Sequence, residues 1–131
     1  GLAMNIRECV SIDQANLQEE FQRIAADYAY WSEKCAKAQQ SYLLHKMERQ
    51  RMWAQTKIEL RETLTMQGER VTEARLDTEI EVNDEYCAAK EMEVISEVEY
   101  VKLKGYLEAI KTKREMLISL GAHLRQEMKT V

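Results

Sequence analysis

The apolar residues between Asp13 and Met66 follow a helical period. They recur in steps that alternate between four and three, along one stripe: Leu17, Phe21, Ile24, Tyr28, Trp31, Cys35, Ala38 and Tyr42. That spacing predicts a long helix with a coiled-coil-like seam. Such a helix would be roughly 80 Å long, whereas a compact domain of this chain length has a radius of gyration of about 14 Å. We therefore expect the helix to pack against another long helix, from the same chain or a neighbouring one.

The apolar stripe changes after Tyr42. The positions that continue it are His45, Arg49 and Met52. A more apolar line runs instead through Leu43, Leu44, Met47, Trp53, Leu60 and Leu64. This drift predicts that the two halves of the helix pack in different environments.

Local signals place the ends of this helix at about residues 12–66. Ser11 and Gln14 form a candidate capping box, and Asp13 is an alternative cap, so residues 4–12 are interpreted as a short lead-in. Gly68 can adopt the left-handed conformation that ends a helix. We therefore expect the chain to turn near Gly68.

The helical pattern resumes over about residues 72–128, with Thr72 as the cap. Asn83 and Asp84 favour an interruption, which gives either helices at 72–82 and 84–128 or one continuous helix. A buried stripe is predicted at Leu103, Leu107, Ile110, Leu117, Leu120, Leu124 and Met128. Gly105 and Gly121 mark either close helix crossings or tolerated surface positions.

The predicted fold is therefore all-α: a long helical hairpin forming a single domain over residues 1–131. Its aromatic residues lie on more than one face, so we expect a homo-oligomer built through coiled-coil-like seams. We interpret Gly1 to Ala3 as a cloning remnant and Met4 as the native start.

Composition points away from several functional classes. The three cysteines, Cys9, Cys35 and Cys87, are far apart, which favours buried free thiols in a reducing cytosol over disulfides. No apolar stretch is long enough to span a membrane, and no common catalytic motif is present, so we expect no enzyme activity and no cofactor. The acidic residues Asp77, Glu81, Asp84 and Glu85 could form a metal cage, but such a run is more often a solvated face, and we predict no metal site.

Basic residues are concentrated in the second half of the first helix. Residues 46–75 carry seven basic and five acidic side chains, whereas residues 76–99 carry one basic and nine acidic ones. A candidate single-stranded nucleic-acid site has helical spacing at Lys46, Arg49, Trp53, Lys57 and Arg61, with Arg51, Arg70 and Arg75 as extensions. Cations would follow the phosphates, and the indole would stack on a base. The alternative is that these cations pair with Glu48, Glu59 and Glu62 and that Trp53 is part of the core.

The order of these features resembles the UvsY-type recombination mediators of tailed bacteriophages. The similar features are Ile12-Asp13, the aromatic patch Tyr28-Ala29-Tyr30-Trp31, the basic half of the first helix, a turn, Thr72-Glu73, and a closing helix with Tyr100, Leu107, Ala109-Ile110-Lys111, Arg114 and Leu124-Arg125. In that family a K-x-R-L segment bears on single-stranded DNA. Here Lys57 and Leu60 match that segment, whereas Glu59 takes the arginine position and the nearest cation is Arg61.

The resemblance implies a non-enzymatic, ring-forming oligomer that binds single-stranded DNA. It would help to load a RecA-like recombinase in exchange for a single-strand-binding protein, in the cytoplasm of the host cell if the chain is phage-encoded. The main alternative is a structural helical hairpin, such as a virion assembly or scaffold component. A membrane-surface protein fits less well because the apolar seam is narrow. If the first helix does not bind DNA, the second basic segment would do so through Lys102, Lys104, Lys111, Lys113 and Arg114.

Overall fold

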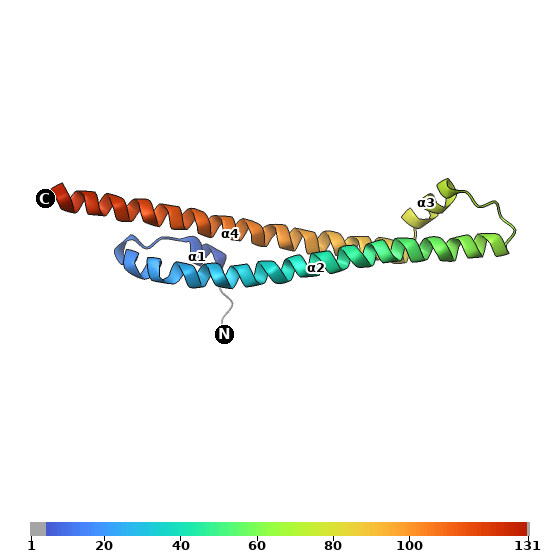
Figure 1. Cartoon of the computed structure of the whole chain (residues 1–131), viewed down its shortest axis with the longest axis horizontal. Coiled ribbons are helices and arrows are strands. Elements are labelled where there is room, and N and C mark those ends of the chain that lie inside the picture. The colour runs from blue at the N-terminus through green and yellow to red at the C-terminus, as the bar shows by residue number, and fades with distance from the viewer. Residues whose placement is uncertain (1–4, 131) are drawn as a thin grey trace. The chain divides into compact units, whose positions relative to one another are not determined.

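The computed structural model describes residues 5–130, and within that range the regular structure is entirely helical (Figure 1). The elements are α1 (Ile6–Val10), the 3-10 turn η1 (Gln14–Asn16), α2 (Leu17–Met66), α3 (Glu73–Glu81) and α4 (Asp84–Thr130). The all-α prediction is thus confirmed. The expected remnant at residues 1–3 and the expected start at Met4 lie outside the described residues.

The chain divides into two compact units, and each long helix contributes to both. The terminal unit is Gly1–Ala36 with Val101–Val131, and the central unit is Lys37–Tyr100. Within the terminal unit Trp31 contacts Tyr106, and Glu20 contacts Lys113. Rising residue numbers on α2 therefore meet falling numbers on α4, so the two helices are antiparallel there. The prediction of a single domain stays a prediction.

The start of the long helix α2 is set by the capping residue Asp13. The Asp13 carboxylate accepts a hydrogen bond from Ala15 N–H at the start of η1, which leads directly into α2. Ser11 is not a cap for this helix, because its hydroxyl donates to the Arg7 carbonyl at the end of α1. The capping-box prediction is therefore wrong. The lead-in also contains a short helix, α1. The Asn5 side chain caps its start by accepting a hydrogen bond from the Arg7 N–H.

Helix α2 ends at a glycine in the left-handed region. Gly68 has a φ of 71°, the Glu69 N–H donates to the Leu64 carbonyl, and the Gly68 N–H donates to the Thr65 carbonyl. This pair of bonds is a Schellman motif, which satisfies carbonyls that a helix end leaves open. The predicted turn near Gly68 is confirmed.

Helices α3 and α4 are separate. The Thr72 hydroxyl accepts a hydrogen bond from Arg75 N–H at the start of α3, as predicted. The Asn83 side chain accepts one from Tyr86 N–H at the start of α4. Two capped helices therefore replace the continuous helix that the sequence left as an alternative.

The terminal unit has an aromatic and aliphatic core. Trp31, Leu103, Ile110 and Leu117 are buried, and the Trp31 ring meets Tyr106 edge to face at 5.2 Å. Leu124 and Met128 of the predicted buried stripe are exposed instead, and the prediction is wrong for them. Phe21 and Tyr28 of the first stripe are partly covered, at 40% and 37% exposure. Inward positions near Phe21 and Tyr28 are taken by the buried acids Glu20 and Asp27.

The inward face of α2 does not shift in the central unit. Tyr42, His45 and Arg49 are half-buried and Thr56 is buried, so the inward stripe continues through these largely polar positions. Of the apolar line predicted to take over the packing, Leu43, Leu44 and Met47 are 46%, 56% and 63% exposed, which contradicts the prediction. Its later members agree with the prediction, since Leu64 is buried and Trp53 and Leu60 are half-buried. The polar positions are accommodated because α4 supplies partners, with Tyr100 stacked on Tyr42 and Glu93 paired with Arg49.

The structure decides between the two alternatives for the glycines and corrects the prediction that all three cysteines are buried. A Cβ at Gly105 would meet nothing within 4 Å, so of the two alternatives this glycine is a tolerated surface position, whereas a Cβ at Gly121 would lie 3.7 Å from the Phe21 ring. Cys87 is exposed, unlike the buried Cys9 and Cys35, and its thiol lies 3.2 Å from the Glu81 carbonyl.

Candidate nucleic-acid interface

Arg49 is directed toward α4. Its guanidinium forms a two-armed ion pair with Glu93, with Nη2 3.2 Å from Oε1. These bonds, although opposed by desolvation, hold the pKa of Glu93 below its usual range and raise that of Arg49. Lys46 is half-buried nearby, and its charge also lowers the pKa of Glu93. Arg49 thus has a structural partner within the central unit.

Arg51 lies on the outer surface of α2. Its guanidinium contacts Glu48 one turn earlier and Gln55 one turn later, the latter at 2.7 Å. Hydrogen bonding to Glu48 raises the pKa of Arg51, and the same bond lowers that of Glu48. Both side chains are largely exposed, so such a pair stabilises the helix only weakly.

Trp53, Lys57 and Arg61 meet at one open hollow on the central unit. The hollow has a volume of about 310 Å³ and is lined by Trp53, Ala54, Lys57, Ile58, Arg61 and Glu62. Trp53 is half-buried, so it belongs neither to a closed core nor to a fully exposed surface. The Lys57 ammonium lies 4.7 Å from the centre of the indole, which is a cation–π contact. These three residues are spaced four apart, which places them on one helix face.

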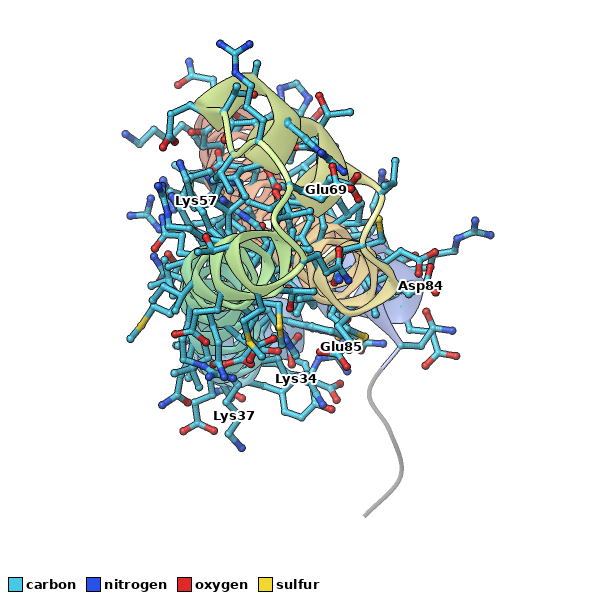
Figure 2. The ribbon with its side chains drawn as sticks, turned by 90° about the vertical axis from the view of Figure 1, so that its right-hand side faces the viewer. Lys34, Lys37, Lys57, Glu69, Asp84 and Glu85 are labelled. Atoms are coloured by element: carbon cyan, nitrogen blue, oxygen red, sulfur yellow. The ribbon has the colours of Figure 1, made fainter. Side chains whose placement is uncertain are left out.

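Acidic residues of α3 reach the same cations. Glu73 Oε2 lies 2.6 Å from Lys57 Nζ, and Glu73 Oε1 lies 2.7 Å from Arg61 Nη2. Asp77 approaches Lys57 at 3.6 Å. Hydrogen bonds from Lys57 and then Arg61 hold the pKa of Glu73 below its usual range, and the bond to Glu73 raises the pKa of Lys57. Figure 2 shows Lys57 on the α3 side of α2.

The structure thus brings together three of the eight predicted site residues. Arg49 and Arg51 have other partners, and Arg70 is an exposed residue of the connection between α2 and α3. The expected alternative partners Glu48, Glu59 and Glu62 are replaced for Lys57 and Arg61 by Glu73 and Asp77. Sequence reasoning missed these two acids as neighbours of the site. The acidic composition of residues 76–99 was an available signal for Asp77, whereas Glu73 precedes that segment.

The second basic segment does not form one exposed cluster. Lys113 is 2% exposed and donates to the Cys9 carbonyl, so it is not accessible to DNA. Lys111 pairs with Glu108 at 3.2 Å. Lys111 and Arg114 border a separate groove of about 490 Å³ over Ile24 and Tyr28. This groove also places an aromatic residue, Tyr28, beside two cations, but it leaves out the buried Lys113, which the second basic segment was predicted to contribute.

Residues 5–130 contain neither a metal-binding cluster nor a membrane-spanning helix. In that range no group of three or more histidine, cysteine or acidic side chains has the arrangement to hold a metal ion. Two members of the imagined acidic cage have cationic partners instead, since Asp77 contacts Lys57 and Glu81 contacts Lys90. The same range contains no helix with the length and apolar character required to cross a membrane.

Comparison of the chain with protein-family models, with characterised proteins and with solved structures finds no match.

Proposed function

We propose that this chain is a non-enzymatic, single-stranded DNA-binding accessory protein of recombination. The observation that carries the proposal is the hollow in which the half-buried Trp53 lies beside Lys57 and Arg61. An aromatic face next to cations suits a single strand, because a base can stack on the indole while the neighbouring phosphates contact the cations. The hollow is open, so a strand can enter it from the side.

The resemblance extends this proposal to a mediator role. In that role the chain loads a RecA-like recombinase onto the strand in exchange for a single-strand-binding protein, and no bond is made or broken. One hollow with two cations binds a strand weakly. Several copies arranged in a closed ring hold it more firmly, because each further contact is intramolecular once the first has formed.

Exposed apolar residues support the homo-oligomer. Leu44, Met47 and Ile58 are each more than half exposed and lie along one side of α2 in the central unit. Val94 and Val98 of α4, also more than half exposed, are spaced four apart. Apolar residues gathered on helix faces in this way are typical of surfaces that associate. We propose that these faces form the helix–helix seams between subunits.

A structural helical hairpin without a nucleic-acid ligand is the second candidate. It is favoured by the ion pairs that Arg49, Arg51, Lys57 and Arg61 already make within the chain. In this alternative Arg49, Lys57 and Arg61 serve only to fix α4 and α3 against α2, Arg51 pairs only within α2, and the exposed apolar residues serve assembly alone.

Salt dependence distinguishes the two candidates. Binding of a dye-labelled thymidine oligonucleotide is followed by fluorescence anisotropy over a series of salt concentrations. For single strands, log K falls with log salt concentration by about 0.7 per phosphate contacted, so the proposed protein shows a steep decline. Absence of binding at low salt, or binding that salt does not weaken, contradicts the DNA-binding proposal and leaves the structural hairpin.

Two matched variants locate the site. Lys57→Ala with Arg61→Ala removes both cations from the hollow, and we expect weaker binding with a shallower salt dependence. Lys34→Ala with Lys37→Ala removes two exposed cations from a part of α2 outside the hollow and is the control. Circular dichroism checks that both variants remain helical. Equal affinity of the two variants would place the DNA site elsewhere.

A further inference from the structure

Helix α3 is fixed beside the hollow by its apolar side. Leu76 and Ile80 of this nine-residue helix are fully buried, at 0% exposure each. The Gly68 turn and the capping residue Thr72 lead the chain into α3, and Asn83 leads it out into α4. In Figure 2, which views the chain end on, α3 lies on the same side of α2 as Lys57.

The polar side of α3 places one carboxylate between the two cations of the hollow. Glu73 contacts Lys57 with one oxygen at 2.6 Å and Arg61 with the other at 2.7 Å. Asp77, one turn later, is a second and more distant acceptor for Lys57 at 3.6 Å. A carboxylate that bridges two cations one helical turn apart occupies the position that a DNA phosphate would need.

These contacts are exchangeable. The side chains of Glu73 and Asp77 are 62% and 56% exposed, and that of Arg61 is 51% exposed. Ion pairs this exposed stabilise a protein only weakly, and salt screens them further. The Glu73 side chain can therefore rotate away from the cations while Leu76 and Ile80 remain buried.

We propose that α3 is an acidic cover whose Glu73 and Asp77 compete with the phosphates of single-stranded DNA for Lys57 and Arg61. This inference rests on the proposed function, because it concerns the same site. The cover makes binding by one hollow weaker than its cations alone would allow. It therefore favours strands that contact several subunits at once over short or isolated strands.

The test compares two variants that remove the same charge. Glu73→Gln with Asp77→Asn neutralises the cover. Asp84→Asn with Glu85→Gln neutralises one aspartate and one glutamate in the first turn of α4, and Figure 2 shows both residues on the far side from Lys57. Each variant changes the net charge by the same amount, so a difference between them reports the local contact and not the overall field.

We expect only the cover variant to bind a thymidine oligonucleotide with a steeper salt dependence than wild type. The slope of log K against log salt concentration should grow in magnitude by up to about 1.4, because each of the two freed cations contributes about 0.7 when it contacts a phosphate. Extrapolated from equal affinity at about 1 M salt, this slope corresponds to binding up to about 25-fold tighter at about 0.1 M. The control should stay close to wild type. Both are checked for helicity by circular dichroism.

Three outcomes are distinguishable. If wild type binds and the cover variant binds more tightly than the control, the cover is supported. If wild type binds but the two variants have equal affinity, α3 is not a cover and the proposed function stands. If wild type and both variants fail to bind at low salt, the proposed function and the cover are both overturned.

Discussion

At the scale of single residues, Lys113 has the environment that a charged side chain favours least. It is 2% exposed in the terminal unit, yet its ammonium donates to the Cys9 carbonyl and lies 3.3 Å from the Glu20 carboxylate. Glu20 in turn accepts from the Asp13 N–H and from Arg23. This network ties the segment around α1 to α2 and α4, because its members come from all three elements.

We predict that Lys113→Met lowers the free energy of unfolding by about 3 kcal/mol, because it removes the buried one of the two cations that pair with Glu20 and leaves only Arg23. The methionine has a similar volume, so loss of packing contributes little. Urea unfolding measures the change, with Lys129→Met, at an exposed position of α4, as the control. Equal effects of the two substitutions would contradict the buried network.

A second residue-scale prediction concerns pH. Burial acts to raise the pKa of Glu20, but the Asp13 N–H, Lys113 and Arg23 outweigh it and hold this pKa below its usual range. A carboxyl with a lowered pKa in the folded state contributes stability above its unfolded pKa of about 4.3, and this contribution is lost as pH falls through the folded value.

Glu20→Gln removes that contribution. We therefore expect the variant to be less stable than wild type at neutral pH, with a difference that shrinks as the pH falls below about 4.3. Urea unfolding at a series of pH values measures it. A difference that stays constant down to acidic pH would show that Glu20 acts only through packing.

At the scale of elements, two glycines should respond to the same substitution in opposite directions. Gly68 has a φ of 71° and open space around it, so alanine there suffers only conformational strain, about 1–2 kcal/mol. Gly105 lies inside α4 with nothing within 4 Å of an added Cβ. Alanine at that position should raise stability by about 1 kcal/mol. Thermal or urea unfolding of both variants checks the signs, and two changes of the same sign would be inconsistent with these backbone assignments.

The ends of the helices could be predicted from the sequence because each depends on a few neighbouring residues. Gly68, Thr72 and Asn83 act through bonds to backbone groups at most five residues away. The inward face of α2 in the central unit could not be predicted in this way. It depends on Arg49 finding Glu93, which is 44 residues away in the sequence. An apolar pattern carries no information about such a partner.

The candidate site shows the same division. The grouping of Trp53, Lys57 and Arg61 follows from their spacing of four along one helix, and the structure brings them to one hollow. The bridging Glu73 could not be predicted, because its position depends on how the chain folds back after Gly68. The charge of residues 76–99 indicated an acidic neighbour such as Asp77, but not Glu73, which precedes that segment, and not which cations either acid would meet.

At the scale of the whole molecule, several apolar side chains of the described helices remain exposed to solvent in the single chain. Leu44 and Met47 are 56% and 63% exposed on α2, and Val94 and Val98 are 54% and 63% exposed on α4. Burying them releases roughly 25 cal/mol for each Å² of apolar surface removed from water. Because α2 and α4 each carry such residues, one copy can offer more than one face, which is what a ring of identical subunits requires.

We therefore expect a solution mass of several subunits by light scattering, and a smaller mass for Leu44→Glu with Met47→Glu. Two carboxylates at these positions would be desolvated in the interface, whereas in a free subunit they remain in water and leave α2 helical. Leu124→Glu with Met128→Glu is the matched control, since it changes one leucine and one methionine at exposed positions of α4. Dissociation by the control alone would move the interface to the terminal unit, and a monomeric wild type would exclude the ring. If the proposed function holds, the dissociated variant should also bind a long single strand more weakly, while its affinity for a strand that fills one hollow is unchanged.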